Sequence, residues 1–258
     1  MTGAPLLDVR ALGRRFGGLT AVDDLSFSVG QDEIVSIIGP NGAGKTTAFN
    51  LITSVYLPTS GEIRFAGRDL VGLPLHKVAD AGIARTFQNL RIFPNLTVRE
   101  NVLVGLTRRN RSSMLSALIR LPSYRAEERR LDELADELVH LVELTPVADQ
   151  LARHLPYGDQ RRVEIARALA TDPKLLLLDE PAAGMNPAEI DELDGLISRL
   201  RSDLKKTILM VEHHMSLVMG ISDRVIVMDQ GRKIAEGTPD QVRADPAVIR
   251  AYLGSGTV

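Results

Sequence analysis

The fold of this 258-residue chain is decided by residues Leu155 to Pro181, which read LPYGDQRRVEIARALATDPKLLLLDEP. A turn that contains Gly158 opens a predicted helix, and the helix leads into an apolar run from Leu175 to Leu178. A uniformly apolar run is typical of a strand buried on both faces of a parallel sheet. Asp179 and Glu180 follow directly, so we expect both carboxylates at the carboxyl edge of the sheet, where open α/β folds bind ligands.

A second motif lies upstream. The segment GPNGAGKTT fits the phosphate-loop pattern G-x-x-x-x-G-K-[ST], and it lies between a β-branched run (33–38) and a predicted helix (46–53). Small residues let backbone N–H groups approach phosphates there, and the next helix presents its positive end. We expect Lys45 to reach the β- and γ-phosphates of a nucleotide. The predicted nucleotide-binding residues of this loop are Gly39, Pro40, Asn41, Gly42, Ala43, Gly44, Lys45, Thr46 and Thr47.

Together the two motifs predict ATP hydrolysis with Mg²⁺. The Thr46 hydroxyl and Asp179 are suited to hold the metal, and Glu180 is suited to take a proton from the attacking water. The turn from Leu155 to Asp159 is a surplus anion site, because helix N-termini entered through glycine bind anions. Either this helix end caps itself through Asp159, or it faces a nucleotide held by another subunit.

Composition sets outer limits. The chain has 44% apolar and 25% charged residues and a net charge of −2, which does not favour nucleic acid as a partner. There is no cysteine, so any metal must use oxygen or nitrogen ligands. The first ten residues lack the features of a secretion signal, and the run from Leu175 to Leu178 is far shorter than the ~20 residues of a membrane span. We expect a cytosolic chain whose membrane role comes through partners.

The pattern along the chain predicts two halves of an α/β core with a helical block between them. Short strands at 7–12, 21–29 and 83–88 and a hairpin at 61–70 surround the phosphate loop. Helical periodicity begins near Ile92, and α/β alternation returns as strands 175–178, 207–211 and 224–228 with helices 187–201 and 215–220. A hairpin at 230–231 and two short helices end the chain. The basic segment from Thr107 to Arg130 is either a solvated helical face or a patch that faces a membrane or a partner.

These motifs resemble one family in order and across almost the whole chain. GPNGAGKTT, Gln88, LPYGDQRRVEIARALA, LLLLDEP and VEHHM together resemble the ATPase subunits of ABC transporters. The resemblance implies one ATPase domain over 1–258: a P-loop NTPase core with a RecA-like parallel sheet and an N-terminal antiparallel β subdomain (1–90 and 168–235), an inserted helical subdomain (91–167) and C-terminal helices (236–258).

The resemblance also implies site roles and a head-to-tail dimer that holds two ATP molecules. Phe16 would stack on adenine, Gln88 would sense Mg²⁺ and water, and His213 would contact the γ-phosphate. The turn residues Pro156, Tyr157, Gly158 and Asp159 would face the nucleotide of the second ATPase subunit, identical or not. Judged without the resemblance, Phe16 is a core aromatic, Gln88 a surface amide and His213 a capped or exposed histidine.

The chain departs from the family pattern in the turn. The commonest turn reads LSGGQ, and here Pro156 replaces the serine, Tyr157 the first glycine and Asp159 the glutamine. The serine hydroxyl that would touch the γ-phosphate is therefore missing, and the Gly158 amide and the helix end must make that contact. Asn186 stands where an aspartate is usual.

These departures from the family pattern indicate which subfamily of ABC transporter ATPases the chain resembles. PYGDQRRVEIARAL, DEPAAGMNP, ARTFQNLRIFPNLTVRENV and PAVIRAYLG are similar to ATPase subunits of branched-chain amino acid importers. The implied partners are transmembrane permease subunits and, indirectly, a periplasmic or extracellular binding protein, which would place the chain on the cytoplasmic face of the membrane. Ile92, Phe93 and Leu96 indicate either a groove for a permease helix or a small local core.

Three other kinds of protein are alternatives to the importer ATPase. Lipopolysaccharide export uses a similar ATPase, but the insert after Val104 fits the importer better. A soluble ABC protein would usually carry two ATPase units or a long coiled coil. A P-loop kinase or GTPase would leave the Leu155–Asp159 turn unexplained.

Overall fold

A six-stranded sheet organises the computed structural model, which describes residues 4–109 and 122–253. Its strand order is β10-β9-β3-β8-β7-β6, with β10 antiparallel to β9 and every other neighbouring pair parallel. The alternation of strands and helices along the sequence predicted an α/β fold with a parallel sheet, and the structure confirms this prediction. The strands are β3 (Ile34–Ile38), β6 (Ile83–Arg85), β7 (Leu175–Asp179), β8 (Thr207–Val211), β9 (Arg224–Asp229) and β10 (Arg232–Gly237).

This sheet is buried on both faces because side chains alternate across a strand. In β7, Leu176 and Leu178 belong to the hydrophobic core on the helical side, whereas Leu175 and Leu177 belong to the core on the opposite side. All five residues of β7 are buried, as are those of β3 and β8. Burial on both faces explains why these strands read as uninterrupted apolar runs.

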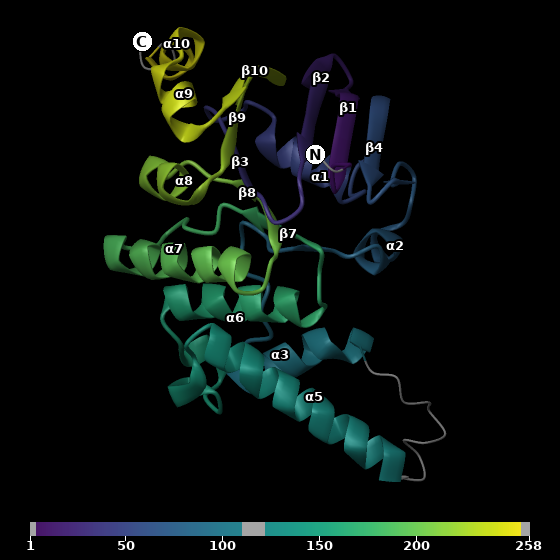
Figure 1. Cartoon of the computed structure of the whole chain (residues 1–258), viewed down its shortest axis with the longest axis vertical. Helices are drawn as coiled ribbons and strands as arrows, with labels where there is room; N and C mark the ends of the chain where they lie inside the picture. The colour runs from purple at the N-terminus through teal and green to yellow at the C-terminus, as the bar shows by residue number, and fades with distance from the viewer. Residues whose placement is uncertain (1–3, 110–121, 254–258) are drawn as a thin grey trace.

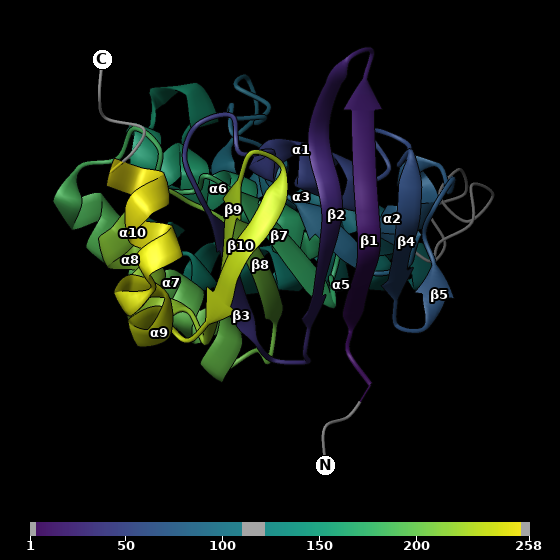
Figure 2. The ribbon, with the colours of Figure 1, turned by 90° about the horizontal axis from the view of Figure 1, so that it is seen from above.

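A second sheet of four antiparallel strands lies beside the first, in the order β2-β1-β4-β5. Figure 2 shows it next to β9 and β10, with α1 (Lys45–Ile52) close to β2. The predicted hairpin at 61–70 is confirmed as β4 and β5, and the first strand runs to Phe16, four residues further than predicted. The strands are β1 (Leu7–Phe16), β2 (Leu19–Val29), β4 (Ser60–Phe65) and β5 (Arg68–Asp69).

Helices gather at one end of the molecule, where α3, α5 and α6 pack on one another (Figure 1). The prediction of helix from Ile92 is wrong by six residues, because Pro94 interrupts the segment and Thr97 caps the helix in a capping box with Glu100. Residues 110–121 of the basic segment lie outside the described residues. The helices before the sheet resumes are α2 (Leu75–Asp80), α3 (Val98–Leu106), α5 (Pro122–Leu141) and α6 (Tyr157–Ala170).

The C-terminal part completes the helical cover of the sheet. Asn186 caps its first helix in a capping box with Glu189, so this departure from the family pattern has a local structural role. In the two described ranges, no helix is long and apolar enough to cross a membrane. The remaining helices are α7 (Pro187–Ser202), α8 (Met215–Ile221), α9 (Pro239–Ala244) and α10 (Pro246–Leu253).

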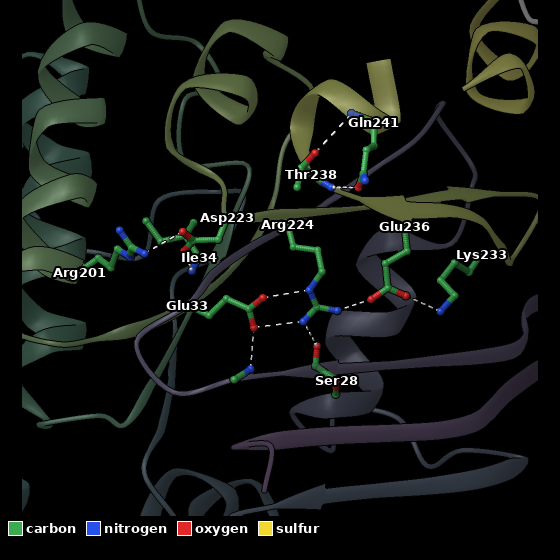
Figure 3. A network of polar contacts seen from close by, with 11 residues as sticks. Ser28, Glu33, Ile34, Arg201, Asp223, Arg224, Lys233, Glu236, Thr238 and Gln241 are labelled. Atoms are coloured by element: carbon green, nitrogen blue, oxygen red, sulfur yellow. Dashed lines mark hydrogen bonds and ion pairs between the residues drawn. The ribbon is translucent and has the colours of Figure 1, made fainter. Parts of the chain in front are cut away.

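Arg224 connects neighbouring strands at the edge of the sheet where β3 and β9 begin (Figure 3). Its guanidinium donates to both carboxylate oxygens of Glu33, at 2.9 and 3.1 Å, and to the backbone oxygen of Ser28 at 2.6 Å. A further ion pair joins it to Glu236 of β10. Hydrogen bonding to Glu33 is the main cause that raises the pKa of Arg224. These contacts join β2, β3, β9 and β10 at the edge of the sheet opposite Asp179.

Candidate nucleotide site

The phosphate loop connects β3 directly to α1, as the sequence predicts. Gly44 precedes the helix with φ +96°, a left-handed conformation that favours glycine. A Cβ at Gly44 would lie 2.3 Å from the backbone oxygen of Ala21, so the site also needs glycine for space. No side chain caps α1. Its first N–H groups are therefore available to an anion.

Lys45 is buried beneath this loop with 7% exposure. Its Nζ donates to the backbone oxygens of Gly39 at 2.7 Å and Pro40 at 3.0 Å. Burial lowers the pKa of Lys45, and the nearby Glu180 carboxylate opposes that effect. The ammonium group is thus partly desolvated and held by neutral oxygens, an arrangement that a phosphate anion would improve.

Asp179 lies at the end of β7 with 1% exposure. Its Oδ2 forms an ion pair with Arg85 at 2.7 Å, and Arg85 also donates to Asn50 Oδ1 and Thr53 Oγ1 at 2.7 and 3.0 Å. Asp179 Oδ1 is buried and has no hydrogen-bond partner among the described residues. A buried carboxylate oxygen without a partner fits Mg²⁺ or one of its water ligands, as does the exposed Thr46 at the start of α1.

Glu180 and Gln88 meet at the same edge. Gln88 is exposed, as expected of a surface amide, and its Nε2 donates to Glu180 Oε2 at 2.8 Å. The predicted strand ends at Arg85, and Gln88 follows in a loop. Glu180 has φ +47°, which is unusual for a side chain with a Cβ, and its N–H donates to Val211 at 2.8 Å. The backbone of Glu180 is therefore fixed at the end of β7, and the bond from Gln88 orients its carboxylate.

Glu212 organises the histidine segment beyond β8. It is fully buried; its Oε1 accepts from the Ala182 N–H at 2.8 Å, and its Oε2 accepts from the N–H groups of His213 and His214 at 2.6 and 2.9 Å. The ring of His213 is half exposed, and its centroid lies 4.3 Å from that of the tilted His214 ring. Glu212 thus links the loop after Glu180 to His213.

Phe16 lies at the end of β1 with 37% exposure, so the interpretation as a core aromatic is wrong. Its ring contacts Tyr56 edge to face at 5.2 Å, and the Arg14 guanidinium lies 4.5 Å from its centroid. An exposed aromatic ring in contact with a cation is suited to stacking on a base.

The predicted turn at Leu155–Asp159 is different in the structure, because helix α6 already begins at Tyr157. Gly158 lies in its first turn, where a Cβ would come 2.9 Å from Glu189 Oε1, so glycine here permits close packing against α7. No side chain caps the helix, and self-capping through Asp159 is wrong. Burial raises the pKa of Asp159, and Arg162 opposes this shift.

The site residues therefore fall into two groups. The phosphate-loop half (39–47 with Asp179 and Glu180) also holds Gln88, whereas the α6 half (155–159) lies on a helix that packs with α3 and α5, away from α1 (Figure 1). Phe16 stands apart on the antiparallel sheet.

A groove of about 730 Å³ lies beside the Gln88 loop, and its lining includes Leu75, Ile83, Ile92, Phe93 and Val104. Phe93 is 45% exposed, which contradicts the alternative that it forms part of a small local core. Sequence reasoning missed Arg85 and Glu212. Both directly end or follow short apolar strands at the carboxyl edge, which is the signal that identified Asp179.

Because the phosphate loop passes straight from a parallel strand into a helix, the chain is a P-loop nucleotide-binding protein. The model described as "ABC transporter" matches residues 22–183, and one described as "Branched-chain amino acid ATP-binding cassette transporter" matches residues 232–257. The chain belongs to the ABC transporter family and is an ATPase of that family.

Similar proteins agree with this assignment. The chain is 50% identical to the high-affinity branched-chain amino acid transport ATP-binding protein BraF of Pseudomonas aeruginosa, over 97% of this chain and 98% of that one. It is 51% identical to LivG of Escherichia coli K12, with the same name and coverage, and 36% identical to the lipopolysaccharide export protein LptB of that organism, over 96% and 97%.

One solved structure is similar over nearly its whole length. The ADP conformation of MJ1267, an ATP-binding cassette of an ABC transporter, superposes with a TM-score of 0.84 and 31% identity, over 98% of this chain and 100% of that one. The dimeric, post-hydrolysis structure of the cassette MJ0796 with ADP and Pi gives 0.76 and 25%, over 90% and 98%.

Proposed function

We propose that this chain hydrolyses ATP in a site shared by two ATPase subunits and thereby drives branched-chain amino acid import. The observation that carries the proposal is the contact of Gln88 with Glu180 beside Lys45 and Asp179, at the sheet edge where the phosphate loop opens. It brings a phosphate-binding cation, a metal-binding carboxylate and a proton acceptor together.

In the bound state, Lys45 exchanges its two backbone oxygens for the β- and γ-phosphates, and the uncapped start of α1 contributes N–H donors. Thr46, Asp179 and Gln88 would hold Mg²⁺, which neutralises phosphate charge when bound. Arg85 keeps the Asp179 carboxylate in place through Oδ2 and leaves Oδ1 for the metal or its water.

Glu180 is the proposed general base. Its carboxylate takes a proton from the water that attacks the γ-phosphate, and Gln88 orients both. His213, positioned through the backbone bonds to Glu212, donates to the γ-phosphate. Phe16 stacks on the adenine through its exposed ring.

The α6 half faces the nucleotide of the second subunit. Its N–H groups, including that of Gly158, have no side-chain cap and meet the γ-phosphate across the dimer, with Pro156, Tyr157 and Asp159 around it. The dimeric structure of MJ0796 supports a two-subunit arrangement in this family.

The groove beside Gln88 receives a cytoplasmic helix of a permease subunit, which places the chain on the cytoplasmic face of the membrane. Its lining is mostly apolar, with charged side chains such as Arg167 and Glu164 at its border, and the exposed Phe93 supports this role. The organisation that follows is one ATPase domain, with the core and β subdomain at 1–90 and 168–235, the helical subdomain at 91–167 and the C-terminal helices at 236–258.

Phe93→Glu tests the groove. A charge in this apolar lining disfavours helix docking, so we expect transport to be lost while the basal ATPase activity of the isolated chain stays within about twofold. The exposed Leu204, which follows α7 and does not line the groove, provides the matched control Leu204→Glu. Equal loss of transport and basal activity in a folded Phe93→Glu variant would contradict the assignment.

Branched-chain amino acids are the proposed cargo, carried to the permease by a binding protein. The names of BraF and LivG support them, and the lower identity of LptB disfavours lipopolysaccharide. The test reconstitutes the chain with permease subunits and a binding protein encoded beside it. We expect ATP-dependent uptake of radiolabelled leucine, isoleucine or valine that Lys45→Ala abolishes. Uptake of none of these, with active ATP turnover, would contradict the cargo assignment.

A further inference from the structure

A buried ion pair on α6 binds the loop that carries Gln88. Arg161 is completely buried, and its Nη1 donates to Glu164 Oε2 at 2.7 Å. The same guanidinium donates to the backbone oxygens of Phe87 at 2.6 Å and Gln88 at 2.9 Å. Glu164 Oε1 accepts from the N–H groups of Phe87 and Arg91, both at 3.3 Å. The pair therefore holds the loop through four backbone groups.

Stability alone is a weak reason for this arrangement. A buried ion pair often contributes no more than two apolar side chains of similar volume, because both charges lose their hydration. Here Arg161 Nε is also buried and has no hydrogen-bond partner among the described residues. The bonds made by the pair are instead directed at one target, the backbone of residues 87–91.

The position of Arg161 connects three parts of the molecule. It lies one turn after Tyr157 in the α6 half, and its Nη2 is 3.4 Å from the Tyr157 hydroxyl. Its ion-pair partner Glu164 lines the groove proposed for the permease. Gln88, whose backbone it holds, reaches Glu180 through its side chain. A rigid shift of α6 would therefore displace Gln88 relative to Glu180.

We propose that Arg161, together with Glu164, is a positioning residue that sets Gln88 against Glu180 according to the position of α6. Docking in the groove, or closure of the α6 half on a partner's ATP, then changes hydrolysis in the same chain. The proposal rests on the proposed function, because it requires Gln88 and Glu180 to act in turnover.

The test replaces the pair by Arg161→Met with Glu164→Gln in the full chain assembled with its permease. Methionine fills the guanidinium volume without donors, and glutamine keeps an acceptor for the two N–H groups. We expect kcat to fall at least tenfold while the KM for ATP and the melting temperature stay close to those of the unmodified chain. Should this variant not fold, Arg161→Lys, which keeps the charge but replaces the planar guanidinium fork by a single nitrogen on a shorter reach, carries the same test.

The matched control is Arg224→Met with Glu33→Gln. This ion pair also holds backbone groups, the Ser28 oxygen and the Gly30 N–H, but at the edge of the sheet opposite Asp179. We expect this control to leave kcat within about twofold. An equal loss of kcat in both pairs would overturn the proposal.

A double-mutant cycle with Gln88→Ala decides how the pair acts. In the Gln88→Ala background, replacing Arg161 and Glu164 should cause no further loss of kcat. An equal loss in both backgrounds, or no loss in either, would overturn the positioning role. Should Gln88→Ala alone leave kcat unchanged, the proposed function would fall as well, which separates the two failures.

Discussion

The starts of α1 and α6 resemble each other locally but differ in what surrounds them. Neither has a side-chain cap, whereas α3, α7 and α9 each begin with a capping box. Around α1, the same chain supplies a buried lysine and two carboxylates; around α6, the nearest charged groups are those of α6 itself and of α7. The chain therefore has one helix start that is surrounded by a lysine and two carboxylates and a second helix start without such groups.

Removing the phosphate-loop half should have the largest effect. Lys45→Ala deletes a charge-assisted contact of about 1.5–3 kcal/mol, so we expect ATP affinity to fall roughly 10- to 100-fold and turnover to be lost. The fold should persist, because Lys45 bonds only to backbone oxygens of its own loop. Isothermal titration with ATP and thermal unfolding measure both, and unchanged affinity would contradict the role of Lys45.

Altering the α6 half should give the opposite pattern. Gly158→Ala places a methyl group 2.9 Å from Glu189 Oε1, so either the Glu189 side chain, which is held in the Asn186 capping box, or the first turn of α6 must shift. We expect ATP affinity to be unchanged and kcat to fall by about 10², a typical cost of misplacing a group by 1 Å. Gly195→Ala on α7 is the control, since its methyl group would meet only Arg199 at 3.8 Å. If Gly158→Ala lowered ATP affinity as much as Lys45→Ala, the predicted difference between the phosphate-loop half and the α6 half would be contradicted.

The sequence predicted the phosphate-loop half far better than the α6 half, and the reason is physical. A phosphate loop and a buried strand are specified by adjacent residues, so 39–47 and 175–180 were found where the structure has them. Gln88, Arg85 and Glu212 act through partners 30 to 94 positions away, including the bonds of Gln88 to Glu180 and of Arg85 to Asp179. The positions of Arg85 and Glu212 at strand ends are a local signal, but the identity of their distant partners is not encoded locally. The start of α6 was misread as a turn because its glycine serves packing against α7.

The smallest effect is expected for Asp159. This acidic residue lies in the first turn of α6, whereas the first turn of α1 has no acidic residue. Burial raises the pKa of Asp159 in the folded chain, so the protonated form stabilises the fold at low pH. That contribution is present below the unfolded pKa and is lost as the pH rises through the folded pKa. Asp159→Asn does not titrate, so its stability relative to the unmodified chain should increase from acidic to neutral pH.

Urea unfolding at a series of pH values measures this difference. Asp23→Asn on β2 serves as a control on the surface of the antiparallel sheet, where the carboxylate pairs with Arg232. A difference for Asp159→Asn that decreases with rising pH would contradict the burial of this carboxyl group.

The central claim is that the two half-sites of different subunits close on one ATP. Glu180→Gln keeps the shape of the base but removes proton abstraction, which lowers the rate by about 10²–10⁴ and leaves ATP bound. Size-exclusion chromatography with light scattering then reads the assembly state directly, with the chain alone and with a second ATPase subunit. We predict a dimer with ATP and a monomer with ADP, which lacks the bridging γ-phosphate. A monomer in ATP with either partner, despite bound nucleotide, would contradict the shared site.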